Sequence, residues 1–299
     1  MIAEHRARSG GAPLHVNVFC HAPPKRDPQR ERAWITRLAP ELARFGVSPP
    51  TALREIYRSF VEDDAMLAML VRTRPTALSF HFGLPARERV EALRAAGIVL
   101  LGTATSPDEA RRMVEGGCDA VIAQGYEAGG HRGVTSLEAP DDRLGTLALV
   151  RLVVRALDRP VIAAGGIMDG AGIRAALDLG AVAAQLGTAF VACDESSADE
   201  GYRAALRSEA AHHTTMTRAI SGRPARCLAN RFTALVAADD AVPAYPVAYD
   251  LGKALHTAAK AQGEHGYGAQ WAGQGAPLAR AMPAERLVGV LAGELAAIV

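Results

Sequence analysis

The chain has 299 residues, which is enough to bury a large core in one domain or two. Its 33 basic and 32 acidic residues nearly cancel, so its charge gives no reason to expect a nucleic-acid partner or a membrane surface. No apolar run is long enough to span a bilayer, and the charged first residues lack the hydrophobic segment of a secretory signal.

Strand-like and helical segments alternate along most of the chain. Apolar runs of strand length occur at 15–19, 77–82, 98–103, 120–124, 160–164 and 183–186. Helical patterns occur at 2–8, 28–45, 50–72, 86–96, 107–115, 142–157 and 170–179. Apolar strands that alternate with amphipathic helices predict a parallel sheet covered by helices.

The strand at 120–124 leads into a glycine-rich loop that carries His131. Parallel α/β proteins place their chemistry where strands end in such loops. Gly129 and Gly130 let the backbone approach a ligand closely, and His131 can take up or release a proton near neutrality. The alternative is a tight turn with a solvated histidine, and the segments downstream argue against it.

Two consecutive strands end in glycines, at Gly165-Gly166 and at Gly187-Thr188. This pair resembles the phosphate-binding loops that follow strands seven and eight of a TIM barrel, where backbone N–H groups hold the phosphate. With that numbering the chain contains six of the eight strands. We therefore expect a (β/α)8 barrel that lacks its first two strands, which would lie upstream of Met1.

The C-terminal third is more varied. We expect residues 188–218 to be largely helical, residues 221–232 to form a basic, turn-rich segment, and residues 248–261 and 284–298 to form helices. The four cysteines, Cys20, Cys118, Cys193 and Cys227, are widely spread. This distribution favours reduced thiols in a cytoplasm over a disulfide framework or a zinc site, and His212-His213 has no partner at ligand spacing.

The chain resembles the bacterial nitronate monooxygenases, formerly called 2-nitropropane dioxygenases, which are FMN-dependent TIM-barrel enzymes. The resemblance covers essentially the whole chain and rests on segments 16–24, 124–133, 164–167, 185–188, 222–226 and 271–274. It implies three regions: an FMN-binding barrel at 1–190, a helical and loop lid at 191–248, and C-terminal helices at 249–299 that pack on the barrel.

The resemblance also implies the site. Asn17, Gln124 and Gly129 would contact the flavin. The phosphate end would be held by Gly165, Gly166, Gln185, Leu186, Gly187 and Thr188. Amide side chains suit a flavin edge because they both donate and accept hydrogen bonds. For Asn17 and Gln124 the alternative is that they only tie loops together.

In this family an alkyl nitronate reduces FMN and O2 carries the oxidation on to a carbonyl compound and nitrite. His131 matches the catalytic histidine, either as the base that deprotonates a neutral nitroalkane or as the group that orients an anionic nitronate. Tyr245, Tyr249 and Lys253 recur every four residues and match a set that would line the substrate entrance. An ordinary solvated helix face is the alternative for these three.

Other conspicuous residues have simpler interpretations. We expect the arginines of the basic segment, Arg223, Arg226 and Arg231, to brace loops, and Trp271 to serve packing. Two other functions remain open: an FMN-dependent enoyl or quinone reductase that uses NAD(P)H, and a non-catalytic barrel remnant that folds only with strands from another chain. The oligomeric state cannot be read from the sequence.

Overall fold

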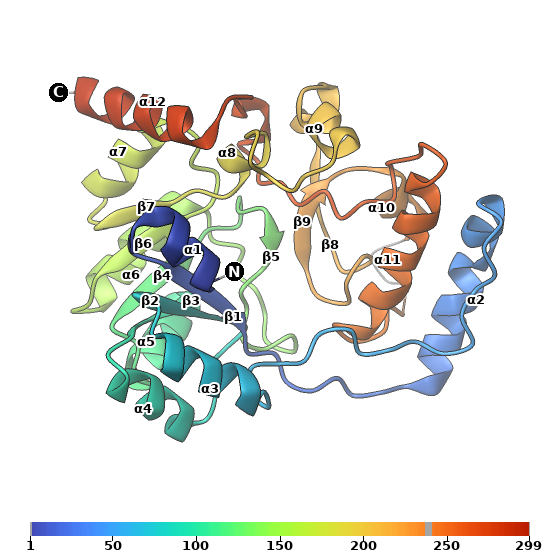
Figure 1. Ribbon diagram of the computed structural model, residues 1–299, viewed down its shortest axis with the longest axis horizontal. Coiled ribbons are helices and arrows are strands. Elements are labelled where there is room, and N and C mark those ends of the chain that lie inside the picture. Colours follow the sequence, from blue (N-terminus) through green and yellow to red (C-terminus); the bar gives the residue numbers. More distant parts are fainter. Residues whose placement is uncertain (1, 237–240, 299) are drawn as a thin grey trace.

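A parallel sheet of six strands forms the centre of the computed structural model, which describes residues 2–236 and 241–298 (Figure 1). The strands are β1 (His15–Phe19), β2 (Ala77–His81), β3 (Val99–Ala104), β4 (Ala120–Gln124), β6 (Val161–Ala164) and β7 (Ala183–Gln185), and they neighbour one another in that order. The sheet curls into a half-barrel, so all six predicted strands and the barrel-type class are confirmed.

Helices cover the outer face of this sheet. They are α3 (Asp64–Thr73), α4 (Arg87–Ala95), α5 (Pro107–Glu115), α6 (Thr146–Ala156) and α7 (Gly170–Asp178). The main core lies between the two layers and includes Leu78, Phe80, Leu100 and Val121, all fully buried. Alternate strand residues face the inside of the half-barrel, where Ile122 packs in a smaller cluster.

Two predicted helix boundaries were wrong for the same reason: a carboxylate sets a later start. The helix expected over 50–72 begins only at α3, where the Asp63 side chain accepts the N–H of Met66 at 2.9 Å. The helix expected from residue 142 begins at Thr146, whose N–H is bound by the distant carboxylate of Glu127. Residues 50–63 form an extended loop instead of a helix.

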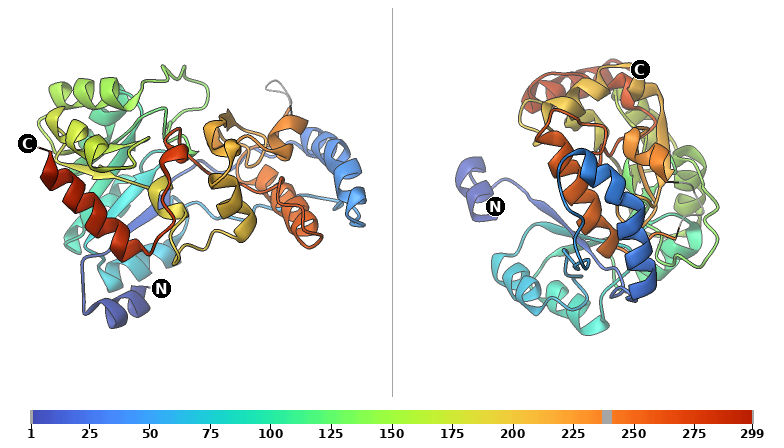
Figure 2. Two further views of the ribbon diagram at one scale, coloured as in Figure 1. Left: turned by 90° about the horizontal axis from the view of Figure 1, so that it is seen from above. Right: turned by 90° about the vertical axis from the view of Figure 1, so that its right-hand side faces the viewer.

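A second body stands beside the half-barrel (Figure 2). It contains α2 (Pro28–Arg44), α10 (Arg231–Leu235), α11 (Val247–Lys260) and a three-stranded antiparallel sheet, β5 (Gly130–His131), β9 (Ala225–Leu228) and β8 (Thr214–Thr217). In Figure 1, α2 and α11 lie together at its far side, and Leu38 and Leu42 share a buried cluster with Leu251 and Leu255.

The prediction that residues 188–218 are largely helical was wrong. They form α8 (Thr188–Val191), α9 (Glu200–Leu206), the 3-10 turn η1 (Glu209–His212) and then β8. The β-branched run Thr214-Thr215-Met216-Thr217 pairs with β9 instead of continuing a helix. Four residues of the expected lid region, 237–240, lie outside the described residues.

Three further helical elements complete the fold. The 3-10 turn η2 (Ala276–Leu278) leads to α12 (Ala284–Ala297), which packs on α7, and α1 (Ile2–Ser9) lies at the N-terminal end with no buried residue. The Glu294 carboxylate of α12 accepts the N–H of Gly170 at 2.9 Å, at the start of α7. No helix among the described residues is long and apolar enough to cross a membrane.

Candidate active site

His131 lies where the two bodies meet. It belongs to the short strand β5 and pairs with Ala225 of β9, so the predicted loop is anchored to the second body. Its Nε2 lies 2.8 Å from the Oγ of Ser221, which is itself buried. The rings of Tyr245 and Trp271 each have their centroid 5.2 Å from that of the imidazole.

A cavity of about 410 Å³ opens in front of His131. Seven of the residues predicted for the site line it: Asn17, Gln124, Gly129, His131, Gln185, Tyr245 and Tyr249. The remaining wall is formed by Phe19, Tyr57, His81, Thr103, Ile122, Gly130, Ala164 and Trp271. The strand ends of the half-barrel and the aromatic residues of the second body therefore share one cavity.

A smaller chamber of about 110 Å³ adjoins this cavity. Its lining includes four other predicted residues, Gly165, Gly166, Gly187 and Thr188, and shares Gln124, Gly129, Ala164 and Gln185 with the larger cavity. Leu186 and Lys253 line neither cavity. Leu186 packs against the hydrophobic cores, and Lys253 lies exposed outside the entrance.

The smaller chamber is held in place by Glu127. Its carboxylate accepts the Thr146 N–H at 2.8 Å and the Thr146 hydroxyl at 2.9 Å, and that hydroxyl also lies 2.9 Å from the carbonyl of Gly165. Gly165 and Gly166 have φ angles of 124° and 71°, which side chains rarely tolerate. The histidine loop, the start of α6 and the glycine loop are thus tied together.

The two amide side chains differ in how much capacity they leave for a ligand. Gln124 donates to the carbonyl of His131 at 3.0 Å and accepts the N–H of Gly133 at 2.7 Å, so it fixes the loop while lining the cavity. Asn17 accepts from Ser79 at 2.7 Å through its Oδ1. The Nδ2 group of Asn17 is therefore the better candidate for donating to a bound ligand.

His131 is neutral in this environment. Burial, as the largest cause, and the nearby His81, Arg223 and His21 together lower the pKa of His131 to about 3. Burial likewise lowers the pKa of His81 to about 4, although its bond to the carbonyl of His131 opposes the shift. Both imidazoles therefore remain unprotonated at neutral pH.

Arg223 lowers the pKa of all three histidines near the site, His131, His81 and His21, although burial is the largest cause for each and His81 acts on His131 more strongly than Arg223 does. The side chain of Arg223 is buried, donates to the carbonyl of Val134 at 2.5 Å and lies 4.1 Å above the ring of Phe82. Burial lowers the pKa of Arg223 to about 10, which leaves the guanidinium charged at neutral pH. Within the described part of the chain it forms no ion pair, and its Nε has no hydrogen-bond partner.

The prediction that the arginines brace loops is confirmed. Arg223 is joined to Val134, as above, and Arg226 donates to the carbonyl of Tyr126 at 3.0 Å. Arg231 pairs with Glu264 at 3.0 Å. Arg223 both braces a loop and acts electrostatically on the site, because the groups that hold its guanidinium, the Val134 carbonyl and the Phe82 ring, carry no charge.

The entrance is built from aromatic groups and one lysine. Tyr245 precedes α11, so only Tyr249 and Lys253 lie one helical turn apart. The Lys253 ammonium lies 2.5 Å from the hydroxyl of Tyr57 and 5.5 Å from the ring centroid of Tyr249. Cation–π contacts of this kind keep the lysine beside the cavity mouth.

Four polar residues that line or support the site, His81, Thr103, Tyr57 and Ser221, were not predicted from the sequence. His81 ends β2 as Gln124 ends β4, so the same strand-end rule would have indicated it. Thr103 lies in β3, close to the end of that strand. Tyr57 lies in the loop that was predicted as helix, and Ser221 lies in the basic segment whose pairing was unforeseen.

Comparisons with known proteins identify the family of the chain. The family model of nitronate monooxygenase matches residues 3–294. Proteins named nitronate monooxygenase from Paraburkholderia phytofirmans and Pseudomonas aeruginosa are 57% and 55% identical over 99% and 95% of this chain, and 81% of each relative is covered.

Among solved structures, a nitroalkane oxidase from Streptomyces ansochromogenes matches with a TM-score of 0.89 and 43% identity, over 99% of this chain and 84% of that one. FabK from Thermotoga maritima is more distant, with a TM-score of 0.71 and 26% identity over 99% and 79% of the two chains. The chain belongs to the nitronate monooxygenase family, and membership implies a flavin-dependent oxidoreductase.

Proposed function

We propose that this chain binds FMN and oxidises alkyl nitronates with O2 to a carbonyl compound and nitrite. Beyond family membership, one observation carries the proposal: among the described residues no carboxylate lies within ion-pair distance of the buried Arg223 guanidinium, on which Glu109 and Glu138 act only from farther away, and Arg223 lowers the pKa of His131. A buried charge without a close counter-ion is costly. An anion bound in front of His131 would add to the compensation, and a nitronate is such an anion.

FMN fits the two adjoining cavities. The small chamber presents glycine backbone at 165–166 and 187–188, which suits a phosphate group without requiring a lysine. A Cβ added at Gly187 would meet nothing within 4 Å, so this position opens onto free space. The larger cavity, with Asn17 and Gln124 in its wall, would hold the ring system. When bound, FMN would supply the redox chemistry by accepting electrons from the nitronate.

The protonation state of His131 favours nitronates over neutral nitroalkanes. A histidine whose pKa lies at about 3 is a weak base, so removing a proton from a nitroalkane would be slow. A nitronate has already lost that proton. When Ser221 donates to Nε2, the remaining proton of His131 is on Nδ1, and that N–H is available to orient the nitronate oxygens.

The residues at the entrance would then favour an anionic substrate over a neutral one. Lys253 attracts an anion at the mouth, and Tyr57 and Tyr249 hold its ammonium group in place. Two cations, the exposed Lys253 and the buried Arg223, would thus attract an anionic substrate from outside the lining of the cavity. A neutral substrate would gain nothing from either.

The first experiment is to purify the protein with FMN and record its visible spectrum before and after anaerobic addition of propionate 3-nitronate. We expect a change in flavin absorbance without NAD(P)H, and nitrite release when O2 is admitted. Bleaching by NAD(P)H but not by the nitronate would favour the enoyl or quinone reductase. A protein that retains no flavin would favour the non-catalytic alternative.

A further inference from the structure

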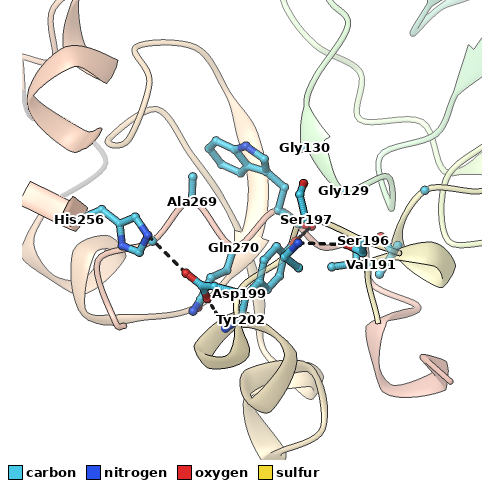
Figure 3. A pocket seen from close by; sticks show the side chains of 15 residues that line it. Gly129, Gly130, Val191, Ser196, Ser197, Asp199, Tyr202, His256, Ala269 and Gln270 are labelled. Atoms are coloured by element: carbon cyan, nitrogen blue, oxygen red, sulfur yellow. Dashed lines mark hydrogen bonds and ion pairs between the residues drawn. The ribbon is translucent and has the colours of Figure 1, made fainter. Parts of the chain in front are cut away.

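A second cleft, larger than the active-site cavity, shares Trp271 with that cavity. Figure 3 shows the side chains that line it. Its volume is about 490 Å³, and its walls come from the 196–199 loop, α9, α11 and the 268–271 segment. Asp199 and His256 face one another at its polar end, with 3.9 Å between carboxylate and imidazole. Gly129, Gly187 and Thr188 also line the smaller chamber, and the other residues of the cleft have no part in the proposed reaction.

Trp271 is the partition between the cleft and the active-site cavity. The two linings have three residues in common, namely Gly129, Gly130 and Trp271. Because glycine has no side chain, Trp271 is the only one of the described residues whose side chain can separate the two spaces. Removing it would join the cavity of about 410 Å³ to the cleft of about 490 Å³.

The indole is held in place from both sides. The indole N–H of Trp271 donates to the hydroxyl of Tyr249, and the hydroxyl of Tyr202 donates to the Trp271 carbonyl. The backbone of Trp271 also forms an isolated antiparallel bridge with Cys227. The partition is therefore fixed by both its main chain and its side chain, and does not depend on packing alone.

We propose that Trp271 determines the length of nitronate that the enzyme accepts, by closing the end of the active-site cavity nearest His131. This inference rests on the proposed function. The native enzyme then prefers short nitronates, and an opened partition admits longer alkyl chains into the cleft. The cleft is a latent subsite for an alkyl chain, and its lining includes Val191 and Ala269.

The test compares three variants: Trp271→Ala, Trp271→Phe, and Trp271→Ala combined with Ala269→Leu, which refills part of the cleft. Steady-state nitrite release is measured with ethyl, butyl-1 and hexyl-1 nitronate. For Trp271→Ala we expect the ratio of kcat/KM for hexyl over ethyl nitronate to rise about tenfold or more, since each methylene in an apolar pocket contributes about tenfold or more. Trp271→Phe and the double variant should remain closer to the native ratio.

A binding experiment separates this inference from the proposed reaction. Propionate and hexanoate each carry a planar anionic carboxylate, which resembles the planar nitronate group. Their affinities for the FMN-loaded protein are measured by calorimetry. Trp271→Ala should favour hexanoate selectively, and the double variant should reverse that gain. Equal changes for short and long ligands would overturn the inference. Native enzyme that releases no nitrite from any nitronate would overturn the proposed function, while the carboxylate series would still decide the role of Trp271.

Discussion

Three histidines around the site make the native state sensitive to acid. Burial is the largest cause of the lowered pKa in each case, to about 3 for His131 and about 4 for His81 and His21. In the unfolded chain each returns to about 6.5. The unfolded state therefore binds more protons below pH 6.5, so stability is complete above that value and falls as the pH falls toward 4.

The size of this effect follows from the shifts. For a group that is protonated only in the unfolded state, each unit by which the pH falls lowers the free energy of unfolding by about 1.4 kcal/mol. Between pH 6.5 and pH 5 each of the three imidazoles then removes about 2 kcal/mol from the free energy of unfolding. His131 lines an open cavity, so water lowers its actual share below this upper value.

The assay is urea unfolding of the FMN-loaded protein between pH 5 and pH 8, for the native chain and for His131→Gln. Glutamine can still bond to Ser221 but does not titrate. We expect the free energy of unfolding of the variant to fall less than that of the native chain as the pH is lowered. The difference between the two losses should reach up to about 2 kcal/mol at pH 5. His212→Gln, at an exposed position, is the matched control. Parallel curves for native protein and His131→Gln would refute the reasoning.

The other predictions concern the supports of the site. Glu127→Ala should lower the free energy of unfolding by about 1–2 kcal/mol through loss of a helix cap, and should weaken FMN binding, whereas Glu127→Gln should retain most of both. Ser221→Ala should lower kcat/KM for nitronates about tenfold with unchanged FMN affinity, as measured by nitrite release and fluorescence titration. Gly129→Ala places a Cβ 2.5 Å from the Gly273 nitrogen and should lower the melting temperature. Gly187→Ala should keep the melting temperature and weaken only FMN binding.

The half-barrel could be predicted because its signals are local. A strand such as β4, Ala-Val-Ile-Ala-Gln, is buried along its whole length, and the pattern is visible in five consecutive residues. The start of α5 was also predictable, since Ser106 caps the helix and Pro107 follows it. Strand ends meet at one edge of a parallel sheet, so the gathering of Gln124 and Gln185, the last residues of β4 and β7, followed from their positions, whereas Asn17 lies at the centre of β1.

The second body could not be predicted in the same way because its contacts are distant in sequence. Strand β5 has two residues and β9 has four, too few to show a period of two. The packing of α2 on α11 joins segments about two hundred residues apart, and each helix alone shows only that one face is apolar. Ser221 could not be linked to His131 until β5 was known to pair with β9.

Two buried arginines lie near His131, where the two bodies meet, and they differ in their ion pairing. Arg132, the next residue, is fully buried, and its guanidinium pairs with Asp141 at 2.9 Å while also donating to the carbonyl of Gln124. Arg223, on the other side, has no such carboxylate within the described residues. The two buried arginines near His131 thus differ in whether a carboxylate lies within ion-pair distance. Both cations hold loops, but the charge of Arg223 is offset only by Glu109 and Glu138 from beyond ion-pair distance, so an anionic substrate bound beside His131 would add to that compensation.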